Sequence, residues 1–425
     1  MKNSYLKLIC LFCLGCLSLK DALAQLTFSG EIRPRTELRH GFKKPAFEDQ
    51  EVAFFTEQRT RLMLQYTLKK YEFKLSLQDV RIWGSVDQVF KNDPSLTNIH
   101  EAWGKYNFNK NVSLKVGRQE LNYDNARILG NLAWAAQSRS HDLAKFIYTG
   151  KEQTIHLGVA FNQDANTPEF GKLASTYYST VKNYKTMQFL WYHKNFTKGA
   201  LSLLVLNNGV QIGTDSLSSV NFSQTAGLTG SVELNKIALD GEFYYQVGKD
   251  QVDRNISAWM ASLNASLKLG TSVIKVGGDY LSGTDQNDIK NHSFTPLYGT
   301  NHKFYGLMDY FFVGNPHDEV GLADYYVKTK FKTGDRSSLL THLHYFSATA
   351  TIPDPLDINR SMPSGLGVEL DAIYDLNVSK EVNFKFGYSQ MFGTRSMEVI
   401  KGGDKNEFNA WAWAMLTFKP VFIEK

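Results

Sequence analysis

Alternation of apolar with polar or small residues runs through almost the whole chain after residue 25, and it constrains the fold more than any other feature. In the segment 71–78, every odd-numbered residue is apolar and every even-numbered residue is polar. Closely similar patterns recur in 112–117, 154–161, 259–269 and 327–332. A period of two residues is the signature of β-strands, and we find no convincing long amphipathic helix. The sequence therefore predicts an all-β fold.

The connections between these alternating runs are of two kinds, which take turns along the chain. Short turns lie near 69–70, 109–111, 150–152, 195–199, 235–236, 270–271, 333–337 and 375–381. Longer polar loops lie around 40–53, 83–97, 122–140, 163–185, 208–222, 248–254, 282–320, 349–364 and 394–407. Short periplasmic turns at one end and long extracellular loops at the other are typical of an outer-membrane β-barrel, whose strands of about 9–11 residues are long enough to cross.

The number of strands follows from parity. We count 19 alternating runs, but the run 304–312 carries no clean polar face. A bacterial barrel of one chain needs an even number of strands. We therefore treat 304–312 as part of one long outer loop, 282–320, which is the best candidate for a lid. The prediction is a single transmembrane antiparallel β-barrel of about 18 strands.

A soluble β-sandwich, a propeller or a secreted lectin is the alternative to a membrane barrel. A propeller needs a repeated blade motif, and we see no fixed period. Aromatic residues make up 13% of the chain, which suits the girdles at the two lipid interfaces of a barrel. No uninterrupted run of about 18 apolar residues occurs, which excludes a helical membrane protein. Loop asymmetry favours the barrel.

The first 24 residues have the pattern of a cleaved signal peptide. Lys2 and Lys7 precede a short apolar core, and Ala22-Leu23-Ala24 forms an A-x-A cleavage site. All three cysteines lie in this segment, and lipidation of Cys16 is the weaker alternative. The barrel would then occupy 25–425, without cysteine, in the outer membrane of a Gram-negative bacterium. That part carries 44 basic and 41 acidic residues, a surplus too small for a nucleic-acid partner.

Arginines on the first two predicted strands point to an anion path. If apolar residues face lipid, the polar set faces the lumen, and 9 of the 13 arginines lie between Arg33 and Arg139. A row of guanidinium groups suits carboxylate ligands. The predicted path consists of Arg33, Arg35, Arg59, Arg61, Lys328 and Lys330. The alternative is a structural ladder in which these arginines pair with Glu31, Glu37 and Glu57.

No catalytic constellation emerges, so we predict no enzyme activity and no cofactor. Ser138, His141 and Asp142 are near neighbours in sequence, but a triad is recognised by geometry. His342 and His344 would point into the lumen from one strand. Two histidines without a suitably spaced carboxylate or thiol are weak evidence for a metal site.

Two segments resemble the alginate export family of outer-membrane β-barrel proteins. The first is 117–142, from Gly117-Arg-Gln-Glu-Leu through Trp134 to Ser138-Arg-Ser-His-Asp142; the second is 294–311, Phe-Thr-Pro-Leu-Tyr-Gly-Thr-Asn-His-Lys-Phe-Tyr-Gly-Leu-Met-Asp-Tyr-Phe. The resemblance implies an 18-stranded barrel and passive export of an anionic uronate polymer through an arginine-lined constriction. It also implies that 117–142 folds inward and narrows the pore. The positions that match the family motifs are Arg118, Asp124, Arg127, Arg139, Asp142, His302, Tyr305, Gly306 and Asp309.

Three functions remain open at this point. The first is export of an anionic polysaccharide such as an alginate-like uronate polymer. The second is a general or substrate-specific porin for uptake of anionic oligosaccharides or other small solutes, and the third is a barrel hydrolase or adhesin. The expected partners are the anionic polysaccharide or small anions, outer-membrane lipid, periplasmic chaperones and the barrel-assembly machinery. The cargo itself is not encoded in a readable motif.

Overall fold

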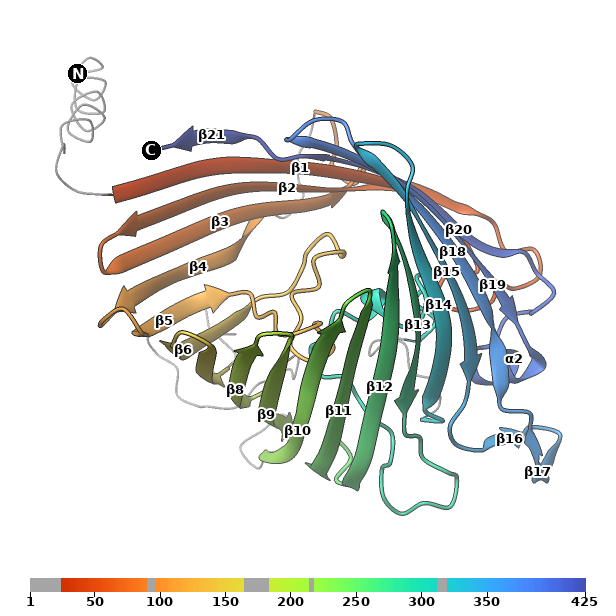
Figure 1. Ribbon diagram of the computed structural model, residues 1–425. Helices are drawn as coiled ribbons and strands as arrows, with labels where there is room; N and C mark the ends of the chain where they lie inside the picture. The colour runs from red at the N-terminus through yellow and green to blue at the C-terminus, as the bar shows by residue number, and fades with distance from the viewer. Residues whose placement is uncertain (1–23, 90–96, 164–182, 214–217, 312–318) are drawn as a thin grey trace.

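One antiparallel sheet closes on itself in the computed structural model, which describes residues 24–89, 97–163, 183–213, 218–311 and 319–425 (Figure 1). Strands that are neighbours in the sheet follow one another along the chain. The last strand is interrupted at Lys419-Pro420, where proline cannot donate to the ladder. Its two parts both pair with the first strand and close the ring. Counted as one, they complete a barrel of 18 strands within the described residues, as predicted.

The barrel strands are β1 (Ala24–His40), β2 (Ala53–Leu68), β3 (Tyr71–Ile82), β4 (Thr97–Asn107), β5 (Val112–Gln119), β6 (His141–Thr149), β7 (Gln153–Phe161), β8 (Thr186–Phe196), β9 (Gly199–Ile212), β10 (Ser219–Leu234), β11 (Ile237–Lys249), β12 (Asn255–Leu269), β13 (Ser272–Leu281), β14 (Leu322–Lys332), β15 (Ser337–Ser347), β18 (Gly365–Asn377), β19 (Val382–Gly393), β20 (Asn409–Phe418) and β21 (Val421–Glu424). The connections at the long-loop end also hold a 3₁₀ turn, η1 (Asn301–Lys303), a hairpin of β16 (Ile352–Asp354) and β17 (Asp357–Met362), and a short helix, α2 (Arg395–Lys401). Among the described residues, no helix is long and apolar enough to cross a membrane.

The two faces of each strand differ in polarity, as the alternation predicts. On β2 the inward Arg59 is 3% exposed, whereas the outward Leu62 is 46% exposed. Leu228 and Leu263, on β10 and β12, are likewise exposed at 49% and 69%. An apolar surface that encircles the whole molecule would be costly in water and marks contact with lipid. The polar side chains therefore line the interior.

Most turns and loops fall where the sequence predicts them, but one predicted loop has the wrong extent and several predicted segments lie partly outside the described residues. Residues 304–311 form no strand, which agrees with their assignment to the outer loop. The predicted loop 208–222 is wrong in extent, because β9 reaches Ile212 and β10 begins at Ser219. Amide side chains extend this pairing: Asn207 donates to Gln188 at 2.7 Å and accepts from Gln224 at 2.8 Å. Most of the predicted signal peptide, much of loop 163–185 and residues 312–318 of the predicted lid lie outside the described residues.

Two connections from the long-loop end turn into the barrel instead of standing above it (Figure 1). We call 120–140 the first inward loop and 291–311 the second inward loop; residues 285–290, which precede the second, are exposed. Their backbones are hydrogen bonded to each other: Gly130 N–H donates to Tyr298 at 2.7 Å, and Thr300 N–H donates to Ala126 at 2.8 Å. Both loops contribute to an apolar core inside the barrel, with buried Leu121, Ile128, Leu129, Phe294, Tyr305, Met308, Tyr310 and Phe311. The lumen is therefore narrowed by a packed structure.

Candidate functional site: the lumen around the inward loops

Four arginines on β1 and β2 form what we call the arginine cluster: Arg33, Arg35, Arg59 and Arg61. Cross-strand register places Arg33 directly opposite Arg59. All four side chains point into the barrel and are buried, each at most 9% exposed. The four lie side by side on the wall that β1 and β2 form.

Three of the four arginines donate hydrogen bonds to the first inward loop; the fourth, Arg61, donates to Gln78 on β3 at 2.7 Å. Arg33 donates to the carbonyl oxygens of Ala133 at 2.8 Å and Trp134 at 2.9 Å. Arg35 donates to the same Trp134 oxygen at 2.9 Å, and its guanidinium lies 4.3 Å from the centre of the Trp134 ring. Arg59 donates to Ser138 Oγ at 2.9 Å. The cluster therefore holds the loop against the wall.

Carboxylates of the same two strands neutralise much of the cluster. Arg35 forms ion pairs of 2.8 Å with both Glu37 and Glu57. Arg59 forms one of 2.6 Å with Glu31. These pairs are the structural ladder that alternation left open, and they coexist with the contacts to the loop. An anionic solute would have to compete with these carboxylates and with the loop carbonyl oxygens for the guanidinium groups.

Arg127 fastens the first inward loop to a different part of the wall. Its guanidinium is completely enclosed and bonds to Glu242 at 2.8 Å and, through two parallel hydrogen bonds of 2.9 Å, to Asp279. Burial by itself lowers the pKa of an arginine, but the carboxylates of Asp279 and Glu242 outweigh it and raise the pKa of Arg127 well above its ordinary value. Arg127 is thus a permanent cation that bridges the lumen-filling loop to β11 and β13.

Arg139 joins the two inward loops. Its Nη1 donates to the carbonyl oxygens of Gly130 at 3.3 Å and Gly299 at 3.0 Å. Burial lowers the pKa of this guanidinium. Arg139 thus bonds to backbone carbonyl oxygens, whereas the Arg127 guanidinium bonds to carboxylates.

The second inward loop carries the other residues of the resemblance. His302 Nδ1 lies 2.8 Å from Asp309 Oδ1, and the His302 ring stacks on Trp134 with centres 4.5 Å apart. Tyr305 is buried 5.1 Å from the Arg127 guanidinium. Gly306 has φ +81°, and a Cβ there would lie 2.5 Å from Glu369, so this close approach to the wall requires glycine. These residues connect the second inward loop to the first inward loop and to the barrel wall.

Two motif residues lie elsewhere. Arg118 on β5 and Asp142 on β6 are register partners on the outer face of the barrel, joined at 2.8 Å and exposed at 41% and 60%. They do not line the lumen. Asp124 does belong to the first inward loop, and it accepts hydrogen bonds from Ser202 and Trp191 on β9 and β8.

Lysines occupy the lumen nearer the short-turn end. The predicted Lys328 and Lys330 lie on the inward face of β14, where Lys330 is exposed and Lys328 lies 4.5 Å from the Tyr326 ring. Lys275 stands opposite Lys328 in register and pairs with Asp240 at 3.1 Å. Here the charges are less completely enclosed than in the arginine cluster.

A further set of cations, which we call the lysine row, consists of Lys105, Lys115 and Lys145. They are successive register partners across β4, β5 and β6. Lys105 pairs with Glu72 at 2.9 Å, but Lys115 and Lys145 form no ion pair with a carboxylate of the described residues. Lys115 instead lies 3.7 Å from the centre of the Trp103 ring. The sequence alone does not reveal this row: alternation assigns each lysine to a face of its strand, but the register that brings the three together comes from the structure.

The chain matches one protein family and is similar in fold to several solved structures. A family model described as Alginate export matches residues 24–346. No curated protein matches the chain. Among solved structures, Pseudomonas aeruginosa OccK9 has a TM-score of 0.60 at 10% identity, covering 93% of this chain and 98% of that one. A BenF-like porin from Pseudomonas fluorescens has a TM-score of 0.60 at 15% identity, covering 95% and 100%. Pseudomonas aeruginosa OpdK with vanillate has a TM-score of 0.56 at 9% identity, covering 93% and 99%.

Proposed function

Because the chain belongs to the alginate export family of outer-membrane β-barrels, we propose that it passes an anionic polysaccharide, an alginate-like uronate polymer, passively out of the periplasm. In this proposal the short-turn end faces the periplasm, as in outer-membrane barrels generally. The polymer enters past the lysine row and meets the inward loops, which the arginine cluster holds in place. No energy source is needed, since a lined pore allows transport down a gradient.

The lysine row is the observation that carries the proposal. Like charges directly opposite one another across two strands destabilise a sheet by roughly 0.2–1 kcal/mol, so the pairing of Lys115 with Lys145, neither of which forms an ion pair with a carboxylate of the described residues, calls for a functional reason. Ammonium groups at Lys115 and Lys145 match the carboxylates of a uronate chain. The ring of Trp103 lies against the Lys115 ammonium and holds it on the wall. Together they form a surface suited to an acidic saccharide.

A second candidate is uptake of small anions, and the packing of the two inward loops favours it. Buried side chains such as Leu129 and Tyr310 fill part of the lumen, which suits a small solute better than a polymer. OpdK, a barrel of similar fold, was solved with the small carboxylate vanillate. In this candidate the same lysine row attracts a single carboxylate at a time.

A planar-bilayer measurement separates the two candidates. Residues 25–425 are inserted, the reversal potential is measured in a salt gradient, and polymannuronate or a dimeric uronate is added to each side. Export predicts an anion-selective pore that polymannuronate blocks from the short-turn side, with neutral dextran of equal length as the control. Block by the dimer alone supports small-anion uptake. A cation-selective pore that ignores both would refute the two candidates together.

A further inference from the structure

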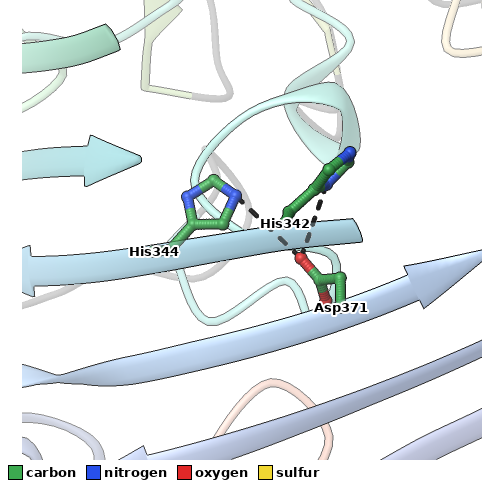
Figure 2. A group of neighbouring side chains, drawn as sticks. All are labelled: His342, His344 and Asp371. Carbon is green, nitrogen blue, oxygen red and sulfur yellow. Dashed lines mark ion pairs between the residues drawn. The ribbon is translucent and has the colours of Figure 1, made fainter. Parts of the chain in front are cut away.

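Two histidines and a carboxylate converge on the lumen wall where β15 meets β18 (Figure 2). His342 stands opposite Asp371 in register, and His344 lies two residues further along the same face. Asp371 Oδ2 lies 3.6 Å from His342 Nδ1 and 3.9 Å from His344 Nε2. One ligand atom from each residue falls within 4.8 Å of the others. The strand partner thus supplies the carboxylate that spacing along one strand could not reveal.

The three converging atoms are left without hydrogen bonds. His342 Nδ1, His344 Nε2 and Asp371 Oδ2 are all buried and unpartnered among the described residues. The side chains of His344 and Asp371 are 0% and 1% exposed. Leaving a buried polar group unsatisfied is costly, and three such atoms facing one another form an arrangement that a shared ligand would complete.

Groups behind these side chains fix their orientation. His344 Nδ1 bonds to Asp324 at 2.8 Å, which turns Nε2 toward the centre of the group. Asp371 Oδ1 accepts a hydrogen bond from Ser389 at 2.5 Å, which leaves Oδ2 facing the histidines. A carboxylate behind a histidine, holding its second ring nitrogen, is the usual support of a metal-binding imidazole.

A second cluster of similar composition differs, because its ligand atoms already have partners within the protein. His100, Glu101 and Glu120 also bring their ligand atoms together. There, however, His100 Nε2 already bonds to Glu120 at 2.6 Å, and Glu101 forms an ion pair with Lys74. That cluster satisfies itself, whereas the group on β15 and β18 does not.

We propose that His342, His344 and Asp371 bind one divalent transition-metal ion, with Zn²⁺ as the ion to test. Two imidazoles and a carboxylate suit a borderline ion such as zinc better than calcium or magnesium, which prefer oxygen ligands. Glu369, opposite His344, has a buried unpartnered Oε2 and is available as a further ligand.

The charges around this group of side chains also favour a bound cation. Asp324, Glu369 and Asp371 are buried together, and no lysine or arginine of the described chain forms an ion pair with any of them. A divalent cation would offset this excess of acidic groups. Glu369 Oε1 also accepts the backbone N–H of Met308 at 2.8 Å, so the ion would sit directly beneath the second inward loop and stiffen its anchorage. This role is independent of which solute the barrel passes.

Metal content after refolding tests the inference. The mature chain is unfolded in urea with EDTA, refolded into detergent with or without Zn²⁺, dialysed and analysed for zinc by mass spectrometry. We expect one zinc per folded barrel. His342→Asn and Asp371→Asn should abolish stoichiometric binding, and Asp324→Asn should weaken it about 10- to 100-fold by releasing the His344 ring.

His193→Asn is the matched control, because this lumen histidine bonds to Ser202 and Asn195 outside the group. It should bind zinc as the unaltered protein does. Folding of every variant is checked by circular dichroism and by the mobility of unheated samples in gels. Cobalt refolded in place of zinc should give a visible absorption band that His342→Asn removes. Folded unaltered protein without stoichiometric zinc, or equal zinc in the Asp371→Asn variant, overturns the inference.

Discussion

The arginine cluster and the lysine row are both sets of cations on the inner wall of one barrel, yet they are differently occupied. In the cluster, Arg35 is shared between Glu37, Glu57 and the backbone of Trp134. In the row, Lys115 and Lys145 have aromatic neighbours and no carboxylate among the described residues. Three arginines of the cluster are therefore committed to fixed protein acceptors, whereas Lys115 and Lys145 form no ion pair with a carboxylate of the described chain, although Lys145 is itself only 8% exposed.

The difference teaches that an inward charge is not by itself a transport group. Arginine is favoured where several fixed acceptors must be bridged, because its planar fork binds two at once. Lysine presents a compact charge on a flexible stem and can exchange partners as a solute moves. In the function that we propose, the charges that meet the solute are therefore the lysines rather than the arginines.

The largest loss of stability should come from Arg127→Met, which removes the most deeply buried cation that holds an inward loop to the wall. The substitution leaves Asp279 and Glu242 buried without their cation, and breaking a buried pair in this way costs about 3–5 kcal/mol. Urea unfolding in detergent should show this loss, and protease should cut within 120–140. Tolerance of Arg127→Met without loss of stability would break the distinction between bracing and free cations.

Replacing the whole arginine cluster by glutamine should free the first inward loop. Each hydrogen bond to a charged group contributes about 1.5–3 kcal/mol, so several losses together should detach 133–138 from the wall. We expect higher and noisier conductance with a small change in reversal potential. A large fall in anion-over-cation permeability would instead make these arginines the path predicted from the sequence.

The double variant Lys115→Gln with Lys145→Gln should instead change ion selectivity and leave stability nearly unchanged. Anion-over-cation permeability should fall about three- to tenfold, since 1.4 kcal/mol of lost attraction is a factor of ten. Stability should stay level or rise by roughly 0.2–1 kcal/mol, because a like-charge pair across strands disappears. Lys194→Gln, on the outward face of β8, is the matched control and should leave permeability unchanged.

Ionic strength offers a milder version of the same test. Raising salt from 0.1 to 1 M shortens the Debye length from about 10 to about 3 Å. The selectivity of the unaltered barrel should then approach that of the lysine double variant, whereas the stability difference caused by Arg127→Met should persist, since buried pairs are screened little. Selectivity that is constant across this range would argue for a steric filter.

The smallest effect is expected for Arg118→Met. Its pair with Asp142 is exposed on the outer face, and such pairs contribute about 0–1 kcal/mol. Unfolding free energy and conductance should both match the unaltered protein within error. A loss as large as that of Arg127→Met would show that membership of the motif, rather than burial, decides the contribution.

Alternation predicted the all-β fold, loop asymmetry favoured the barrel, and parity reduced 19 alternating runs to 18 strands. Alternation identifies the faces because side chains on a strand point alternately to either side, so Arg59 and Leu62 separate without knowledge of the fold. Cross-strand register was beyond its reach. The pairing of His342 with Asp371, or of Lys115 with Lys145, depends on where each hairpin turns.

The partners of the inward loops were the least predictable part. Arg127 meets Asp279 across 152 positions of sequence, and only the folded loop brings them together. Alternation predicts which side chains face inward, and the resemblance implies that 117–142 folds inward. Neither could say that the arginine cluster would bind the backbone of 133–136 rather than an open channel, because carbonyl oxygens leave no trace in side-chain patterns.

The seam between β1 and the final strand has a consequence for how the molecule is made. Glu37 and Trp413 are register partners, and Trp411 Nε1 donates to Glu37 at 2.7 Å, so the ring closes only when nearly the last residues of the chain arrive. Contacts between such distant segments slow folding, because the entropy of bringing the ends together must be overcome first. We expect the inward loops to be enclosed by this late step. A chain ending after β19 should therefore leave 120–140 open to protease during refolding, and protection of that truncated chain would show that the loops pack before the wall is complete.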